Sequence, residues 1–221
     1  MVKKIIIAIA ALAFVAPLYS QDKGKESEVK KPAGNVVTWQ EIVLEDFETT
    51  PYTNKNVSFR VSSDQDASIL IRDNLPATSS SKKYLGLKVK TRGNDSFVIK
   101  PAKDIVIDKF CKSISFWVYG GKTHGEVSFM LQDTEKNNHR LVVVPVINFV
   151  GWKQFTVPLT NKVAQEKDFL NQKKIMKILN IQYRTVGNRE IQKPATWEFV
   201  YLDDITATVR EPRAGKQDDQ W

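Results

Sequence analysis

The chain has 221 residues, a formal net charge of +8 and a single cysteine, Cys111. One cysteine excludes an internal disulfide, so the fold must be stabilised by packing, and we expect Cys111 to be a small buried thiol. The basic excess would suit nucleic acid in a cytosolic protein. Because the N-terminal segment indicates export, nucleic acid is disfavoured, and acidic envelope polymers or acidic protein surfaces are the expected partners.

The N-terminal segment has the pattern of a secretory signal peptide. Two lysines precede an apolar run over residues 5–18, and Ser20 precedes a polar stretch. The run is shorter than the roughly 20 residues that a membrane-spanning helix needs. Without a cysteine near the cleavage point, a lipid anchor is not expected either. We therefore predict a signal peptide over residues 1–20, export, and no membrane anchor.

Polar segments flank the part of the chain that is expected to fold. Residues 21–38 hold charges, Gly and Pro with scarcely any large apolar side chain, which predicts a flexible leader. Residues 211–221 are similarly polar and are predicted to form a flexible tail. The folded domain is therefore placed at residues 39–210.

The predicted domain is rich in short β-branched and aromatic runs bounded by turn residues, which is typical of an all-β protein. The strand candidates are EIVLEDF, VSFRV, ASILIR, YLGLKVKT, SFVIKP, SISFWVYG, EVSFMLQD, HRLVVVPV, WKQFTV, LNIQYRT and WEFVYLDDITAT. Residues 163–178 show one helical pattern, in which Val163, Leu170 and Ile178 recur at helix-compatible spacing. We predict a two-layer antiparallel jelly-roll sandwich with one or two short helices. An immunoglobulin domain is less favoured, since the paired cysteines that flank a Trp are missing.

The last strand candidate contains two adjacent carboxylates. Strict alternation places Asp203 on one face and Asp204 on the other, beside Val200 and Leu202. The residues expected to share the face of Asp203 are Trp197, Phe199, Tyr201, Ile205, Ala207 and Val209. A carboxylate in an apolar surface needs hydrogen-bond donors, a cation or water, because burying it unpaired costs several kcal/mol.

Two explanations of these carboxylates remain open. If the first and last strands are neighbours, Glu48 could join Asp203 and Asp204 as oxygen ligands of a structural calcium, which takes six to eight of them. Alternatively, Asp203 or Asp204 accepts backbone N–H bonds or pairs with a basic side chain while the other faces solvent. No other cofactor is predicted.

Motifs of catalysis are scarce. The two histidines, His124 and His139, lie in no recognisable motif, and HExxH, GxSxG and P-loop patterns are missing. A protein that is not an enzyme is therefore predicted. A glycosidase remains an alternative, because the sequence leaves the separation of carboxylates in space unknown.

An ordered set of short motifs resembles a known family. The motifs are WVYG at 117–120, His124, LQD at 131–133, NFVGWK at 148–153, VPL at 157–159 and FVYLDDITA at 199–207. This order is similar to the outer-layer, or sheath, proteins of spirochaete periplasmic flagella, called FlaA. The resemblance implies a coat around a flagellin core in the periplasm, with the flagellin core and other sheath proteins as partners and a contribution to filament shape and motility. The DFE start and YLDDI finish also resemble sugar-binding jelly-roll modules, some of which carry a structural calcium.

Two glycine-containing loops are the candidate contacts with a filament. They span residues 119–125 and 147–152, and sandwiches expose such loops at their ends. The candidate contact residues are Tyr119, Lys122, His124, Phe149 and Trp152. Aromatic residues are enriched at interface centres, while lysines would steer an acidic partner. The alternative for the aromatic residues is ordinary packing, and the alternative function is a secreted carbohydrate-binding module, which needs exposed coplanar rings.

Overall fold

A computed structural model describes residues 38–59, 65–75, 77–78, 80–159, 163–165, 175–187 and 194–211. The predicted signal peptide at residues 1–20 lies outside this part, as do the leader up to residue 37 and the tail from residue 212. Within the described residues, no helix is long and apolar enough to cross a membrane. Those boundaries of signal peptide, leader and tail remain predictions.

Strands are the main regular structure of the described residues, because β-branched and aromatic side chains alternate along short runs. The strands are β1 (Gln40–Glu45), β2 (Val57–Phe59), β3 (Asp66–Arg72), β4 (Tyr84–Thr91), β5 (Ser96–Ile99), β6 (Ile105–Ile107), β7 (Phe110–Gly121), β8 (Glu126–Gln132), β9 (Asn138–Val144), β10 (Val150–Pro158), β11 (Met176–Arg184) and β12 (Thr196–Arg210). The helical content of the described part is one 3₁₀ turn, η1 (Asn54–Asn56). The predicted all-β class is confirmed.

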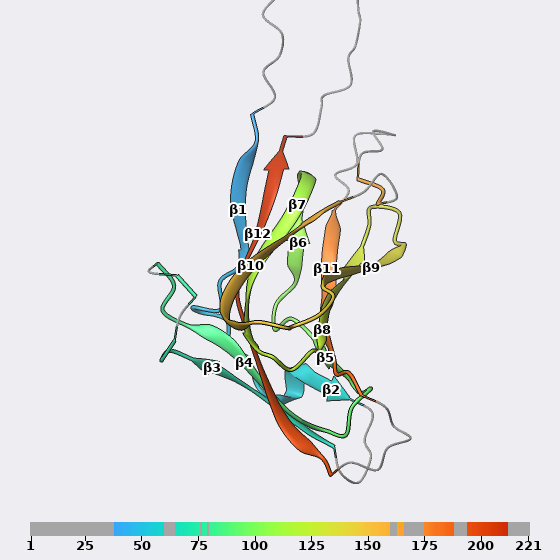
Figure 1. Ribbon diagram of the computed structural model, residues 1–221. Coiled ribbons are helices and arrows are strands. Elements are labelled where there is room, and N and C mark those ends of the chain that lie inside the picture. The colour runs from blue at the N-terminus through green and yellow to red at the C-terminus, as the bar shows by residue number, and fades with distance from the viewer. Residues whose placement is uncertain are drawn as a thin grey trace, which may run out of the picture. The chain divides into compact units, whose positions relative to one another are not determined.

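The strands form two antiparallel sheets that pack face to face (Figure 1). Sheet A has the order β10-β7-β12-β4-β3, and β1 also pairs with β12. Sheet B has the order β2-β5-β11-β8-β9, and β6 also pairs with β11. The first and last strands of the domain are therefore neighbours, with Gln40 opposite Val209. This arrangement is the predicted two-layer jelly-roll sandwich.

The core lies between the two sheets and is built from the inward-facing residues of both. Phe116 of β7 and Phe129 of β8 meet at its centre, with ring centroids 4.8 Å apart. Cys111 is fully buried there, and burial raises the pKa of its thiol to about 12. The expectation of a small buried thiol is confirmed, and a nucleophilic role is unsuited to a thiol held so firmly in its protonated form.

The last part of the predicted helix over residues 163–178 is wrong. Residues 166–174 lie outside the described part, but Met176 and Ile178 belong to β11, where both are buried. Met176 pairs with Ile107 of β6, and Ile178 pairs with Leu131 of β8. The eight-residue spacing between Leu170 and Ile178 fits both periods, whereas the two-residue spacing between Met176 and Ile178 fits the strand alone. Pairing on both sides of β11 decides for the strand.

A β-bulge in β12 overturns the prediction that one face continues along the whole strand. The register of β12 against β7 shifts between Asp203 and Thr206, and Asp204 has a left-handed φ of 41°. Before the bulge, Val200 and Leu202 point into the core. After it, the core residues are Ile205, Ala207 and Val209. A bulge adds one residue to a strand, so the alternation changes phase at that point.

The inversion moves two aromatic residues out of the predicted buried face. Trp197 and Phe199 are 43% and 42% exposed, on the outer surface of sheet A. They were expected to share a face with Ile205, which is fully buried. In the part of β12 before the bulge, the face that carries Trp197 is therefore exposed to solvent.

Gly125 gives a test of the packing at one end of the sandwich. A Cβ atom at Gly125 would lie 2.4 Å from the ring of Tyr183, whose hydroxyl is anchored on Glu198 at 2.6 Å. We expect Gly125→Ala to lower the free energy of unfolding by about 1–3 kcal/mol, as overpacking does. Denaturant unfolding measures the change. Gly121→Ala is the matched control, since nothing lies within 4 Å of its Cβ position. Equal stability of the two variants would contradict this account.

Candidate functional site

Asp203 is fully buried at the bulge and is satisfied by hydrogen bonds. Its Oδ2 accepts bonds from the Ser81 hydroxyl at 2.7 Å and from the Ala77 N–H at 3.2 Å. Its Oδ1 accepts the N–H of Asp204 at 2.9 Å. Burial nevertheless raises the pKa of Asp203 to about 6, because these bonds compensate only in part for lost hydration. The structure thus provides the hydrogen-bonded alternative considered for this carboxylate.

Glu48 also accepts hydrogen bonds from the segment that contains Ser81. Its Oε1 accepts the backbone N–H groups of Lys82 and Lys83 and lies 3.5 Å from the Ser81 hydroxyl. The Lys82 N–H is the largest of several causes that lower the pKa of Glu48. Ser81 therefore bridges Glu48 and Asp203, and hydrogen bonds join the segment before β4 both to β12 and to the segment that follows β1.

Asp204, the third predicted calcium ligand, is only partly buried. Burial raises its pKa, and the nearby carboxylates of Asp46, Glu48 and Glu41 raise it further. These acids do gather where β1 meets β12. Among the described residues, however, no three His, Cys, Asp or Glu side chains are grouped as a metal site requires. Calcium at Glu48, Asp203 and Asp204 therefore stays a prediction.

The two predicted contact loops lie side by side, although they are 22 residues or more apart in sequence. The Lys122 N–H donates to the Phe149 carbonyl at 3.0 Å, and the His124 N–H donates to the Ile147 carbonyl at 3.0 Å. Lys122 and His124 are exposed, and both have left-handed backbones with φ of 55° and 59°. Phe149 is half-buried, with its ring 5.5 Å from that of Phe155. The loops thus form one hydrogen-bonded rim with an exposed cationic side.

Tyr119 and Trp152 pack in an aromatic cluster on the outer face of sheet A. Their ring centroids are 5.5 Å apart, and both rings also contact Tyr201. The indole N–H of Trp152 donates to the Leu75 carbonyl at 2.9 Å. Both side chains are half-buried. Their geometry matches the packing alternative more closely than that of rings presented to a partner.

A surface that the sequence interpretation missed lies next to this cluster. We call Leu70, Lys88, Trp197 and Phe199 the outer strip; Leu70 is 64% exposed, and Lys88 Nζ lies 4.1 Å from the Trp197 ring centroid. A shallow groove of about 110 Å³ runs between Leu70 and Phe199. The sequence holds no clear signal for this surface, because large apolar residues stand on both faces of β12 over residues 197–202.

The rings on this face do not form the flat platform that a sugar-binding surface needs. Among the described residues of the aromatic cluster, ring pairs meet at interplanar angles from 32° to 83°. The most exposed rings, Trp197 and Phe199, have Lys88 Nζ over them at 4.1 and 5.9 Å. Rings that pack against each other and under a cation leave little room for stacking on sugar.

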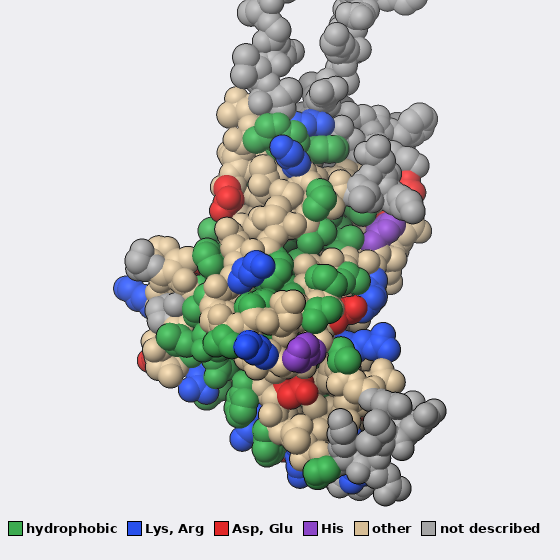
Figure 2. Space-filling model, viewed as in Figure 1, with side chains coloured by type: hydrophobic (Ala, Val, Ile, Leu, Met, Phe, Trp, Pro, Cys, Tyr) green, Lys and Arg blue, Asp and Glu red, His purple; other side chains and the backbone are tan. Residues whose placement is uncertain are grey.

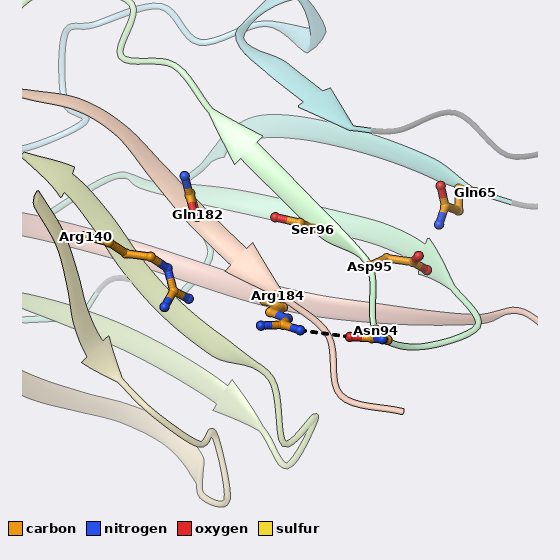
Figure 3. Close-up of a pocket in the computed structure, with 7 residues that line it drawn as sticks. All are labelled: Gln65, Asn94, Asp95, Ser96, Arg140, Gln182 and Arg184. Carbon is orange, nitrogen blue, oxygen red and sulfur yellow. Dashed lines mark hydrogen bonds between the residues drawn. The ribbon is translucent and has the colours of Figure 1, made fainter. Parts of the chain in front are cut away.

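Sheet B carries a separate polar groove of about 320 Å³ (Figure 3). Its lining residues are Gln65, Asn94, Asp95, Ser96, Arg140, Gln182 and Arg184. The guanidinium of Arg184 donates to Asn94 Oδ1 at 3.1 Å, and Arg140 forms an ion pair with Glu126. The carboxylate in the lining, Asp95, accepts a bond from the Thr91 hydroxyl at 2.6 Å. A glycosidase needs two facing carboxylates, and this lining contributes one.

The architecture is that of a β-sandwich module, and solved carbohydrate-binding modules are similar to it. The family 11 module from Clostridium thermocellum, in complex with a β-1,3-1,4-mixed-linked tetrasaccharide, is 13% identical; the match covers 77% of this chain and 96% of that chain, with a TM-score of 0.47. A module solved with β-1,4-galactotriose is 14% identical, with 75% and 94% covered and a TM-score of 0.44. At these identities and TM-scores the likeness carries no information on ligand or function.

The family is given by the sequence comparison. Residues 56–209 match the family described as flagellar filament outer layer protein FlaA, and the chain belongs to this family. A flagellar filament outer layer-like protein of Brachyspira hyodysenteriae is 30% identical over 108 residues, which are 45% of this chain and 50% of the relative. The matched region is thus about half the length of that relative. The resemblance to FlaA noted from the short motifs is confirmed.

The raised pKa of Asp203 predicts a pH-dependent stability. Its folded pKa of about 6 exceeds the ordinary 3.8, so the native state binds the proton more tightly than the unfolded chain. The contribution of Asp203 to the free energy of unfolding is fully present below about pH 4 and is lost as the pH rises to about 6. Relative to Asp203→Asn, the wild type should lose on the order of 2 kcal/mol over this range. Asp73→Asn, at an exposed position, is the control. A constant difference between wild type and Asp203→Asn across pH would contradict the assignment.

Chelation tests the calcium prediction directly. Because the oxygens of Asp203 and Glu48 already accept hydrogen bonds, we expect the melting temperature to be the same with and without EGTA. A bound calcium at about 100 times its dissociation constant would add about 2.7 kcal/mol, which thermal unfolding detects readily. A fall in melting temperature with EGTA, reversed by added calcium, would establish the metal and overturn the hydrogen-bonded explanation.

Proposed function

We propose that the protein is a non-enzymatic structural component of a periplasmic flagellar filament, where it forms part of the sheath around the flagellin core and contributes to filament shape and motility. The observation that carries this proposal is the extent of the family match. Residues 56–209 run from η1 into β12 and so include strands β2 to β11 and nearly all of β12, leaving out β1. The match therefore covers most of both sheets.

The site geometry supports a structural role over catalysis. Asp203 and Glu48 join one segment to β12 and to the segment after β1, so a contribution to stability explains these carboxylates. The polar groove of sheet B has one carboxylate in its lining, engaged by Thr91. The N-terminal signal pattern supports export to the periplasm, where flagellin and other sheath proteins would be the partners. These partners are part of the proposal.

The rim formed by the two contact loops is the proposed filament contact. Lys122 and His124 are exposed there, and the neighbouring Val146 and Val150 are 46% and 66% exposed. Exposed valines beside a lysine combine apolar contact area with electrostatic steering toward an acidic partner. Tyr119 and Trp152 would stabilise the rim by packing, since their rings contact each other.

Incorporation into filaments tests both the function and the rim. We expect the chain to co-isolate with purified periplasmic flagella from cells, as detected by mass spectrometry. Lys122→Glu combined with Val150→Ser should reduce its amount on filaments roughly tenfold, because both changes remove favourable contact at the rim. Lys100→Glu, an equal charge change at an exposed site after β5, should have no effect.

The two possible failures separate the parts of this proposal. A chain that is missing from intact filaments would reject the filament function and leave the carbohydrate-binding alternative ahead. A Lys122→Glu, Val150→Ser variant that keeps its melting temperature and coats filaments normally would reject the rim while leaving the function intact. Tyr119→Ala and Trp152→Ala are unsuitable as primary tests, because loss of either ring disturbs packing.

A further inference from the structure

The polar groove of sheet B gathers hydrogen-bonding side chains in one place. Figure 2 shows Lys and Arg side chains spread over the viewed face of the molecule, so positive charge by itself marks no site there. The groove is about 320 Å³ in volume, the described residues that line it are all polar, and three of the seven are amides. Amide side chains both donate and accept hydrogen bonds. The groove therefore suits a ligand that carries several polar groups.

The register of the strands places these groups together on the outer face of sheet B. Gln182 and Arg184 of β11 alternate with the core residue Tyr183, and Ser96 of β5 is opposite Arg184. Arg140 reaches the groove from β9. Figure 3 shows the guanidinium groups of Arg140 and Arg184 extending toward each other across the groove. An anion between them would contact both.

The two guanidinium groups have one carboxylate between them on this face. Arg140 forms an ion pair with Glu126, and Glu126 is also opposite Arg184 in the register of β8 and β11. The Arg184 guanidinium donates to the Asn94 amide oxygen, a neutral acceptor. Asp95 is 5% exposed, and its side chain points away from both arginines in Figure 3. The arginines of the lining are therefore only partly neutralised.

A buried hydroxyl lies beneath the same side chains. Ser128 of β8 is 1% exposed, faces the outer side of sheet B by alternation and is opposite Gln182. Glu126 lies two residues before Ser128, and Arg140 is opposite Met130, two residues after it, so the ion pair crosses the position of Ser128. The Ser128 hydroxyl has no hydrogen-bond partner among the described residues. Such groups are rare in folded proteins, because leaving them unpaired is unfavourable.

We propose that the polar groove of sheet B binds an acidic saccharide, a sugar unit that carries a carboxylate. Arg184 binds the carboxylate, because a guanidinium presents two parallel N–H groups that match the two oxygens. Gln182 and Ser96, next to Arg184 on the sheet, bind ring hydroxyls, which donate as well as accept. A neutral sugar would leave the arginines without an anion, and an acidic peptide lacks the adjacent hydroxyls that these groups match.

The inference is independent of the proposed filament function, since binding is measured on the purified chain. Trigalacturonate is the probe, and α-1,4-galactotriose, which has the same rings without carboxylates, is the neutral control. Isothermal titration calorimetry should show that trigalacturonate binds at least roughly tenfold more tightly than galactotriose. Its dissociation constant should rise with salt, because exposed charges are screened. A chain that coats filaments but binds no trigalacturonate would reject the groove alone.

Substitutions with opposite expected effects assign the site. Arg184→Ala should raise the dissociation constant of trigalacturonate roughly tenfold, and Arg184→Lys, which keeps the charge but loses the planar fork, by a smaller factor. Glu126→Gln should lower it roughly threefold, because Arg140 then becomes available to the ligand. Arg72→Ala is the matched control, since its guanidinium also bonds a neighbouring asparagine but belongs to sheet A. Arg184 is exposed, so its replacement should leave the melting temperature unchanged.

Four outcomes would overturn the proposal. Absence of trigalacturonate binding up to millimolar concentration would reject the site. Equal affinity for galactotriose would show that the groove takes neutral saccharides, and equal affinity for a triglutamate peptide would show that it takes acidic peptides. Binding of trigalacturonate that is the same in Arg184→Ala and in the wild type would place the site elsewhere.

Discussion

The burial of one carboxylate organises this protein. Asp203 sits at the bulge of the longest strand with no exposed surface, and it is tolerated there because Ser81, Ala77 and Asp204 each donate a hydrogen bond to it. An unpaired carboxylate in the same place would cost several kcal/mol. Without those donors the bulge would lose its support, and β12 is the strand on which β1, β4 and β7 all pair.

The bulge also decides what the molecule shows to its surroundings. Because it changes the phase of β12, one strand supplies core residues on both sides of Asp203 and still presents Trp197 and Phe199 to solvent. The same turn of the chain gathers carboxylates from β1 and its following segment near Asp204. The stability of β12 and the exposure of Trp197 and Phe199 are therefore consequences of the same local irregularity.

The sandwich itself was predictable, because alternation over short runs reports local geometry. Ile114, Phe116 and Val118 face the core from β7, as the pattern in SISFWVY indicates. The prediction failed at Ile178, whose eight-residue spacing from Leu170 is compatible with both helix and strand. Pairing with β6 and β8 makes Ile178 part of β11. The contact loops could be nominated from glycines and aromatic residues. Their mutual hydrogen bonds could not, since these join residues distant in the chain.

The sequence by itself determined the all-β class, the buried thiol of Cys111 and the family resemblance, since each depends on residue type and local spacing. Only the tertiary structure decided which carboxylate is buried, that Tyr119 and Trp152 pack on Tyr201, and that Leu70, Lys88 and Phe199 form one surface. These facts depend on the register between strands and on donors such as Ser81, which is 122 residues from Asp203. Local propensity carries no information on which distant segment will supply a hydrogen bond, so long-range packing makes that choice.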